Sequence, residues 1–288
     1  MDINGCKDKK IFLTGASGFI GRVLLRRLLK RGFRVRVLLN KNDIKIDNPR
    51  LEKVWTDINS LSLDKHLQGI DTVVHLAVYM GNMKDKNGKK FYKVNYAGTK
   101  NLFNLARKRK IRFIYCSSIV VKGKGKDWYT KSKLRATNFI KRSKYLNWVI
   151  VYPTTVINVK RAIEGRTPGF LMARIGSSKR IMNIVDVKNV AKALLKIIEQ
   201  PKTKGEYVLG GINIGVADYL KKMARLKGKL YLPVRIPRCL VKNLVFLFWG
   251  KNNLYNILSS EAVSQRVFSK RAIEKLSYEP KRGLKVLL

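Results

Sequence analysis

Three side chains in the middle of the sequence have the types and spacing of an acid–base group. Tyr129 and Lys133 stand four positions apart in a segment whose apolar residues follow helical spacing, so we expect both on one helix face. A free phenol has a pKa of about 10, and a neighbouring ammonium lowers that pKa toward neutrality. Ser118 ends the preceding apolar segment and can orient a substrate oxygen toward the phenol. We therefore predict acid–base catalysis by Ser118, Tyr129 and Lys133.

A glycine-rich stretch near the start of the chain has the spacing of a dinucleotide-binding turn. It follows a short apolar segment, readable as a buried strand, and it precedes a segment with a helical apolar stripe. The first glycine permits a tight turn, the second leaves the backbone open to a pyrophosphate, and the third lets the helix lie close to the strand. The helix N-terminus would then face the phosphates. The expected cofactor contacts in this stretch are Gly15, Ser17, Gly18, Phe19, Ile20 and Gly21.

The residues after the second expected strand, 34–39, bear on the choice between NAD and NADP. An acidic residue there would accept a hydrogen bond from the ribose 2′-hydroxyl and select NAD. The sequence has Asn40 and Lys41 instead, so no carboxylate at Asn40 repels a 2′-phosphate and Lys41 can pair with one. This favours NADP over NAD. Asp43 remains the alternative, as a loop carboxylate that could still reach the ribose.

Further motifs follow in an order that resembles a known superfamily. They are His75-Leu76-Ala77, then Val94-Asn95-Tyr96-Ala97-Gly98-Thr99, then the pair Ser117-Ser118. The Tyr129–Lys133 spacing by itself also fits an exposed helical pair. With the other motifs in order, the chain resembles the extended short-chain dehydrogenase/reductase superfamily, the epimerases, dehydratases and reductases, over nearly its whole length. Within it the chain is most similar to the dihydroflavonol-reductase, hydroxysteroid-dehydrogenase and hopanoid-associated epimerase group.

This resemblance implies an α/β fold, a Rossmann-type doubly wound parallel sheet with a small C-terminal substrate lobe. We expect the dinucleotide-binding domain in residues 1–157 and 184–200, and the substrate lobe in residues 158–183 and 201–288. The implied activity is that of an NAD(P)-dependent oxidoreductase, epimerase or dehydratase. Its implied substrate is a small molecule, either a sugar nucleotide or a lipophilic alcohol or ketone. The implied assembly is a homodimer paired through two helices.

The resemblance also assigns roles to single residues. Ser118 rather than Ser117 carries the catalytic role, Lys133 also binds the nicotinamide ribose, and His75 and Asn95 are structural. The other implied cofactor contacts are Asp57 and Ile58 beside the adenine, Leu76 and Ala77 beside the nicotinamide ribose, and Pro153 near the carboxamide. The chain departs from the family in a short segment between Ser118 and Tyr129, in Tyr152 where an Arg is usual, and in Asn158 where a Gly is usual.

The charge of the chain is far from balanced. Sixty-two Lys and Arg against 18 Asp and Glu give a formal net charge of +44 over 288 residues. Such a field attracts nucleic acid and anionic membranes, which leaves a non-catalytic or RNA-binding member of the superfamily as the alternative function. The basic residues are spread over nearly every segment, however, which favours a compositional bias. No RNA-binding motif or aromatic-and-basic platform stands out, so specific nucleic-acid binding is not expected.

The remaining features bear on location and on metals. The three cysteines are widely spaced and odd in number, which fits a reduced cytoplasmic protein, and no metal-ligand spacing occurs. Residues 237–251 combine an apolar block with flanking Lys and Arg. That block can lie in an anionic membrane interface as a peripheral contact. Its nearly all-round apolarity favours the alternative, a buried helix of the substrate lobe.

Overall fold

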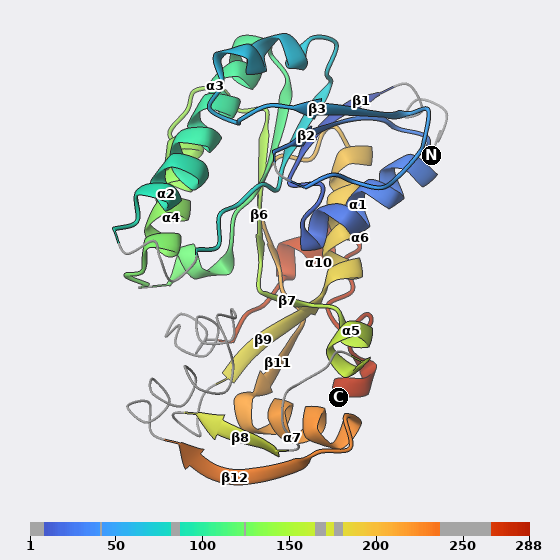
Figure 1. Cartoon of the computed structure of the whole chain (residues 1–288), viewed down its shortest axis with the longest axis vertical. Helices are drawn as coiled ribbons and strands as arrows, with labels where there is room; N and C mark the ends of the chain where they lie inside the picture. The colour runs from blue at the N-terminus through green and yellow to red at the C-terminus, as the bar shows by residue number, and fades with distance from the viewer. Residues whose placement is uncertain are drawn as a thin grey trace.

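The central element of the fold is a sheet of seven parallel strands, in the order β10-β6-β5-β4-β1-β2-β3 (Figure 1). The computed structural model of the chain describes residues 9–40, 42–81, 87–123, 125–164, 171–175, 181–236 and 266–288. The strands of this sheet are β1 (Lys10–Thr14), β2 (Arg34–Leu39), β3 (Leu51–Trp55), β4 (Thr72–His75), β5 (Arg112–Cys116), β6 (Trp148–Pro153) and β10 (Gly205–Leu209).

The strand order reverses beside β1, which makes the sheet doubly wound as expected. β2 and β3 lie on one side of β1, and β4, β5, β6 and β10 lie on the other. Thr14 at the end of β1 is level with Leu38 on β2 and with His75 on β4. In open parallel sheets, ligands bind at the carboxyl ends of the strands where the order reverses. The ends of β1 and β4 therefore mark where a cofactor is expected.

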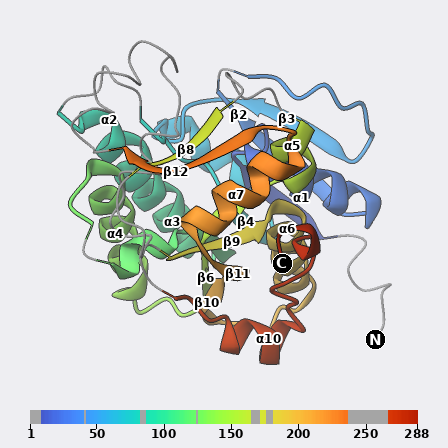
Figure 2. The same ribbon diagram turned by 90° about the horizontal axis from the view of Figure 1, so that it is seen from below.

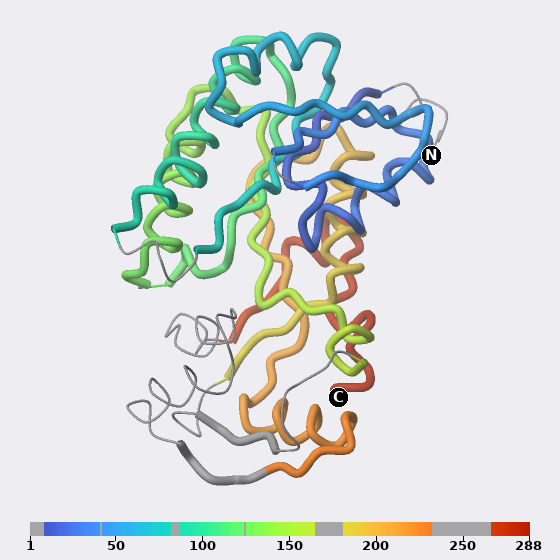
Figure 3. The backbone as a smooth tube through the Cα atoms, viewed as in Figure 1, coloured from blue at the N-terminus to red at the C-terminus, as the bar shows by residue number. Residues whose placement is uncertain are grey.

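One face of the sheet is covered by α1 (Phe19–Lys30) and α6 (Val187–Glu199), which pack side by side. Leu24, Leu25 and Leu28 of α1 are fully buried in the same core cluster as Val190 and Leu194 of α6. The apolar stripe of α1 that the sequence shows is thus its buried face. α10 (Lys270–Leu276) packs against α6 and β10. Figure 3 shows this C-terminal segment, in red, running along the junction between the upper and lower parts of the molecule.

The other face carries a second core cluster under the helices of the middle of the chain. These elements are η2 (Leu61–Leu67), α2 (Lys89–Phe91), the π-helix η3 (Tyr92–Gly98), α3 (Thr99–Lys108), η4 (Ile119–Lys122) and α4 (Trp128–Lys141). Phe103 of α3 stacks edge-on against Phe113 of β5, with ring centroids 5.1 Å apart. Buried Ala136 and Ile140 bring α4 onto the same core.

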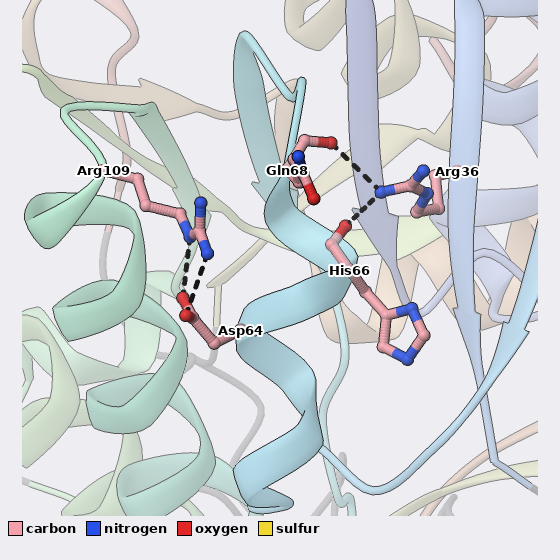
Figure 4. Close-up of polar contacts among 5 residues, drawn as sticks. All are labelled: Arg36, Asp64, His66, Gln68 and Arg109. Carbon is pink, nitrogen blue, oxygen red and sulfur yellow. Dashed lines mark hydrogen bonds and ion pairs between the residues drawn. The ribbon is translucent and has the colours of Figure 1, made fainter.

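Two arginines hold η2 between the sheet and α3 (Figure 4). Arg109, just after α3, donates from Nε and Nη2 to the two carboxylate oxygens of Asp64, at 2.7 and 2.9 Å. On the other side Arg36 of β2 donates from Nη1 to the backbone oxygens of His66 and Gln68, at 2.6 and 3.3 Å. Backbone oxygens at the end of a short helix lack partners within it, so Arg36 closes that end.

A smaller part of the molecule lies below the large sheet (Figure 2 shows it from below). It contains a three-stranded sheet, a two-stranded parallel pair and short helices. Their bounds are β7 (Thr155–Ile157), β9 (Ile181–Asp186) and β11 (Ile212–Gly215) for the sheet, β8 (Leu171–Ile175) and β12 (Leu230–Ile236) for the pair, and α5 (Val159–Glu164), α7 (Val216–Leu226) and η6 (Lys285–Leu287) for the helices.

The expected boundaries need one correction. Residues 201–288 are predicted to belong to the substrate lobe, yet Gly205–Leu209 forms β10 and pairs in parallel with β6 in the large sheet. Tyr207 and Leu209 of β10, and Ala272 of α10, are buried in the core cluster beneath α1 and α6. Gly205–Leu209 is therefore an edge strand of the large sheet.

The third strand, β3, covers Leu51–Trp55. It ends at Trp55, because Asp57 accepts from the backbone N–H of Asn59 at 2.7 Å and turns the chain. Lys41 and residues 237–251 lie outside the described residues. Within the described part of the chain no helix has the length and apolarity needed to cross a bilayer. Searching the same residues finds no group of three His, Cys, Asp or Glu placed to hold a metal ion.

Candidate active site

The glycine turn after β1 has the geometry expected for close approach to a ligand. Gly15 adopts φ +71°, in the left-handed region that glycine enters without strain. The N–H of Gly18 donates to the oxygen of Gly15 at 2.9 Å and closes the turn. A Cβ on Gly15 would lie 2.6 Å from the backbone N of Ala77, and one on Gly21 would overlap the Gly15 oxygen. The turn is thus pressed against the chain after β4, and α1 begins directly on it.

The remaining residues of the turn surround the start of α1. The first N–H groups of a helix have no partner within the helix. The N-cap of α1 is Gly18, which has no side chain to bond them. Phe19 is exposed, Ile20 packs partly into the core, and the Ser17 oxygen accepts from Arg22 Nε at 2.7 Å. Free N–H groups at a helix N-terminus bind phosphates, and a glycine cradle leaves room for them. The residues present therefore fit a dinucleotide.

His75 is a structural residue, as expected. It is fully buried, with Nδ1 2.7 Å from the hydroxyl of Thr14 and Nε2 2.8 Å from the hydroxyl of Thr99. Burial lowers the pKa of His75 to about 3, so the ring is neutral at pH 7. Thr14 also accepts from the N–H of Ala77 at 3.1 Å. This chain of hydrogen bonds fixes the end of β4, where Leu76 and Ala77 lie.

Asn95 ties the segment after β4 to the helices, in line with its expected supporting role. Its Oδ1 accepts from the N–H of Tyr79 at 2.7 Å, and its Nδ2 donates to the Tyr79 oxygen at 3.0 Å. Nδ2 also lies 3.2 Å from the hydroxyl of Ser132 on α4. The segment that borders the crevice is therefore attached to the helix that carries the catalytic candidates.

Ser118, Tyr129 and Lys133 come together at the end of β5. Asp127 caps α4 by accepting from the N–H of Thr130 at 2.9 Å, which places Tyr129 in the first turn of the helix. The side chain of Ser118 lies close enough to the Tyr129 hydroxyl to lower the pKa of that phenol. Ser117 instead pairs its hydroxyl with Thr137 at 2.8 Å inside the core. Ser118 is half-buried, whereas Ser117 is buried, so the geometry leaves Ser118 as the serine that can meet a substrate.

The predicted effect of Lys133 on the pKa of Tyr129 is wrong in this geometry. Burial raises the pKa of Tyr129 to about 12, and the side chain of Ser118 opposes this rise only in part. Burial likewise lowers the pKa of Lys133 to about 8. The reason is desolvation, which disfavours the charged form of both groups. At pH 7 the tyrosine is accordingly a protonated phenol, suited to donate a proton.

Lys133 is held by the strand that precedes the serines. It is 2% exposed, and its Nζ donates to the Cys116 oxygen at 2.6 Å. The same Nζ lies 4.2 Å from the ring centroid of Tyr115, a cation–π contact. Lysine at pH 7 has three donor hydrogens, and these two contacts leave it capacity to bind a hydroxyl.

The expected adenosine contacts lie at the ends of β2 and β3. Asn40 is exposed, and no carboxylate stands at its position. Both oxygens of Asp43 are engaged, Oδ1 by the Ile44 N–H at 2.6 Å and by Lys53 Nζ at 3.1 Å, and Oδ2 by Lys53 at 3.4 Å. These partners hold the pKa of Asp43 below its usual range. Asp57 is exposed, whereas Ile58 is 7% exposed. The Ile58 side chain packs against Gly98, so its contact with an adenine ring stays a prediction.

One cluster beside the site was missed by the sequence reasoning. Tyr152, which stands where the family has Arg, donates its hydroxyl to Glu206 at 2.6 Å. Glu206 also pairs with Lys141 at 2.7 Å, and Lys122 lies over the Tyr152 ring at 4.5 Å. The cluster joins η4, α4 and the edge strand β10 next to buried Pro153. The sequence shows the unusual tyrosine at position 152. It does not show the hydrogen-bond partner of that tyrosine, Glu206, which lies 54 residues away in the chain.

Comparisons with known proteins agree with this geometry. Residues 11–148 match the NAD dependent epimerase/dehydratase family. A putative dihydroflavonol 4-reductase from Synechocystis sp. is 27% identical over 257 residues, 75% of this chain and 72% of that protein. A UDP-glucose 4-epimerase from Vibrio cholerae is 27% identical over 286 residues, 87% of this chain and 85% of that protein. A short-chain dehydrogenase/reductase superfamily structure from Agrobacterium tumefaciens, with bound NAD, has TM-score 0.75 at 18% identity and covers 96% of this chain and 94% of its own.

Proposed function

We propose that this chain, whose residues 11–148 match the NAD dependent epimerase/dehydratase family, is an NADP-preferring reductase or dehydrogenase of the extended short-chain type. It acts on a hydroxyl or carbonyl carbon of a small apolar molecule. The observation that carries the proposal is buried Lys133, which lies one helical turn from Tyr129 on α4 and donates from Nζ to the Cys116 oxygen, two residues before Ser118. A structural role alone does not require a buried ammonium next to a buried phenol.

The chain's own residues supply the proton side of the reaction. In the reducing direction a substrate carbonyl oxygen accepts hydrogen bonds from Ser118 and Tyr129. Tyr129 gives up its proton to that oxygen, and the ammonium of Lys133 stabilises the phenolate left behind. In the oxidising direction the same groups run in reverse. The bound nicotinamide supplies or accepts the hydride at the substrate carbon.

The preference for NADP rests on the charges at the end of β2. Asn40 offers no carboxylate, and Asp43 already uses both oxygens on Ile44 and Lys53. The ammonium of Lys53 neutralises the Asp43 carboxylate, so this carboxylate repels a 2′-phosphate only weakly. Exposed Arg22 lies beside the glycine turn, with its Nε on the Ser17 oxygen, and its remaining donors can pair with a 2′-phosphate.

An apolar substrate is supported by the segment after β4. Val78 and Met80, which follow the Leu76-Ala77 pair, are 39% and 51% exposed although both are apolar. Asn95 holds the backbone of this segment at Tyr79, so the two exposed apolar side chains on either side of Tyr79 are carried by a fixed backbone. The similarity to a putative dihydroflavonol 4-reductase agrees with a lipophilic ketone or alcohol.

A Tyr129→Phe variant tests the proposal. We expect a loss of turnover of about 10²–10⁴-fold, the usual contribution of general acid–base catalysis, with cofactor affinity changed little. The measurement is the change in NADPH absorbance with a panel of lipophilic ketones, alongside cofactor binding by fluorescence. Tyr145→Phe is the matched control, because that hydroxyl bonds the Ile111 oxygen away from the site. Equal turnover in the wild type and the Tyr129→Phe variant refutes the assignment.

A sugar-nucleotide epimerase is the second candidate, favoured by the similarity to a UDP-glucose 4-epimerase over 286 aligned residues. An epimerase removes and returns the same hydride, so it causes no net change in NADPH absorbance. Product analysis with UDP-glucose therefore separates the two candidates. Conversion to the epimer without net oxidation would replace the reductase proposal.

A further inference from the structure

The helices α1, α6 and α10, which lie together in Figure 1, border a cleft that the proposed reaction does not use. It has a volume of about 360 Å³, which is within the range of small-molecule sites. Its lining comes from the end of α1, from α6, and from the end of α10 with the turn that follows it. None of its described lining residues belongs to the glycine turn or to the proposed acid–base group. The cleft is therefore a separate candidate site.

The cleft carries more cations than carboxylates. The carboxylates are those of Glu199 and Glu279, and the cations are those of Arg27, Arg31, Lys192, Lys196 and Arg282. Glu279 lies 2.7 Å from Lys192 Nζ and 2.9 Å from Arg282 Nη1. Glu199 lies 3.6 Å from Arg31 Nη1. Both carboxylates of the cleft are thus already paired with cations.

Arg27 and Lys196 are the cations of the cleft that have no such pair. Both residues are half-buried, and within the described part of the chain neither makes an ion pair with a carboxylate. Burial lowers the pKa of Arg27, and the charge of the nearby Arg282 lowers it further. Asp186 opposes this effect, but it accepts from the Lys188 N–H at 2.7 Å as the N-cap of α6 and does not line the cleft. Two neighbouring guanidinium groups thus border the cleft, and only that of Arg282 has a carboxylate partner there.

The wall of the cleft contains two buried polar atoms without hydrogen-bond partners. Tyr278 is 4% exposed and Asn189 is 2% exposed, and both residues line the cleft. The Tyr278 hydroxyl and Asn189 Oδ1 have no partner among the described residues. Asn189 Nδ2, in contrast, donates to the backbone oxygen of Glu279 at 2.5 Å. Buried polar atoms are nearly always hydrogen-bonded in folded proteins, so these two atoms are a second sign of a ligand site.

The lining also includes an apolar part. Ala193, Leu195 and Leu276 contribute buried side chains to it. A small inorganic ion would leave this apolar surface uncovered, whereas the carbon skeleton of an organic anion can cover it. A guanidinium binds phosphate oxygens in pairs through its parallel N–H groups. The cleft therefore combines a place for an anionic group with a place for an apolar one.

We propose that this cleft binds an organic phosphate monoester, with its phosphate on Arg27 and Arg282 and its carbon skeleton on the apolar lining. A phosphate monoester carries about two negative charges at pH 7 and has three strong acceptor oxygens, so it can serve both guanidinium groups at once. The ligand is a soluble molecule or the headgroup of a lipid, since both present the same group. The binding does not depend on the proposed reaction.

The test compares two double variants that remove the same charge. Arg27→Gln/Arg282→Gln changes the cleft, and Arg26→Gln/Lys275→Gln changes exposed positions on α1 and α10 that do not line it. Thermal unfolding checks that both variants fold. Arg282→Gln alone, at an exposed position, gives the same comparison with one charge removed. The probe is glycerol 3-phosphate, titrated into the full chain by calorimetry at constant ionic strength, with glycerol as the neutral control.

We expect the wild type to bind glycerol 3-phosphate and the cleft variant to bind it about tenfold or more weakly, because two charge-assisted donors are lost. The control variant should stay within about twofold of the wild type, since exposed charges outside the cleft are screened by salt. Absence of binding to the wild type, or equal weakening in both variants, overturns the proposal. Equal affinity for malonate also overturns it, because a dicarboxylate would then serve as well as a phosphate.

Vesicles identify the source of the phosphate group. Phosphatidylcholine vesicles that contain phosphatidic acid present a phosphate monoester, and those that contain phosphatidylglycerol present a phosphodiester. If only the cleft variant loses binding to the phosphatidic acid vesicles, the ligand is a lipid headgroup. If both variants bind these vesicles equally and only the cleft variant loses glycerol 3-phosphate, the ligand is soluble. If the cleft variant loses both kinds of vesicle equally, surface charge alone is recognised and the proposal is wrong.

Discussion

The two faces of the large sheet differ in how they are finished. On the α1 face, which we call the closed face, α6 lies beside α1 and α10 packs against α6, and the core beneath them includes side chains from both ends of the chain. On the α4 face, which we call the open face, the helices cover the sheet, and nothing in the described residues covers those helices. Their outer surface carries a groove lined in part by Arg107, Lys131, Arg135 and Arg142. The glycine turn begins the closed face, and Tyr129 and Lys133 lie on the open one. The proposed cofactor turn and the proposed acid–base residues thus come from helices on opposite faces of the sheet, so substitutions should separate their effects.

Gly21→Val should have the largest effect on cofactor binding and stability, because it adds a side chain where α1 lies closest to the glycine turn. A Cβ at Gly21 overlaps the Gly15 oxygen and also lies 2.8 Å from the Ala16 Cα, so the helix cannot keep its contact with the strand. We expect no measurable NAD or NADP binding and a large drop in melting temperature. Thermal unfolding and cofactor fluorescence measure the two effects.

The matched variant is Gly18→Val, at the exposed position of the same turn. A Cβ there would lie 3.0 Å from the Gly15 oxygen, a contact that a small shift relieves. Cofactor binding should be lost while the melting temperature falls little. Full affinity for both NAD and NADP in the Gly18→Val protein would contradict the assignment of this turn.

The second prediction addresses Lys133 on the open face. With its pKa lowered to about 8 by burial, Lys133 loses its charge above pH 8 and no longer stabilises the Tyr129 phenolate. We expect kcat/KM for reduction to fall above pH 8, because this parameter reports the pKa values of the free enzyme. Tyr129, with a pKa of about 12, stays protonated over the same range.

Lys133→Met provides the control for that profile. Its activity should be lower by about 10²-fold at pH 7 and should show no fall near pH 8. Cofactor affinity should fall less than in Gly18→Val, since Lys133→Met removes only the expected contact with the nicotinamide ribose and leaves the glycine turn intact. An identical pH dependence in wild type and variant would show that another group titrates.

The third prediction concerns a link between the sheet and the closed face. Arg112 at the start of β5 is 6% exposed, and it donates to the oxygens of Ile197, Gln200 and Thr203 at 2.8, 3.2 and 2.8 Å. These oxygens end α6 and the turn after it, and they would be left without partners. Arg112→Met should therefore lower the free energy of unfolding by about 3 kcal/mol, measured by urea titration.

Arg112→Met should leave cofactor affinity unchanged, because Arg112 bonds the end of α6 and does not touch the glycine turn. Lys108→Met, an exposed position at the end of α3, is the control for stability and should stay within about 0.5 kcal/mol of wild type. A stability loss shared by both variants would mean that the loss of positive charge, not the buried contacts of Arg112, is responsible.

The sequence predicted the closed face better than the open one, for a physical reason. The glycine turn, β1, α1 and β2 follow from local spacing, since turn geometry and apolar periodicity are set by neighbours in the chain. The open face depends on contacts between distant segments. The Tyr152–Glu206 bond, the groove and the place of β10 in the large sheet all join residues tens of positions apart.

For the three catalytic candidates, the sequence predicted which residues come together but not their protonation states. Their identity followed from type, spacing and family resemblance, and the structure brings Ser118 to Tyr129. The protonation states of Tyr129 and Lys133 could not be predicted from the sequence. Residue spacing reveals a neighbouring charge, but it does not reveal that burial removes water from around both side chains. Desolvation raises the pKa of Tyr129, the reverse of the expected direction, so the phenol is protonated at pH 7.

The smallest expected effect is a change of cofactor preference at the end of β2. Asn40→Asp places a carboxylate where a ribose 2′-hydroxyl would accept it and a 2′-phosphate would be repelled. We expect the ratio of NADP to NAD affinity to fall by about tenfold, roughly 1.4 kcal/mol. Asn40 is exposed and its neighbour Asp43 already holds Lys53, so the fold and the open face should be untouched. Asn48→Asp, elsewhere in the same loop, adds the same charge as a control. If the two variants shift the ratio equally, long-range charge sets the preference and the end of β2 does not read the ribose.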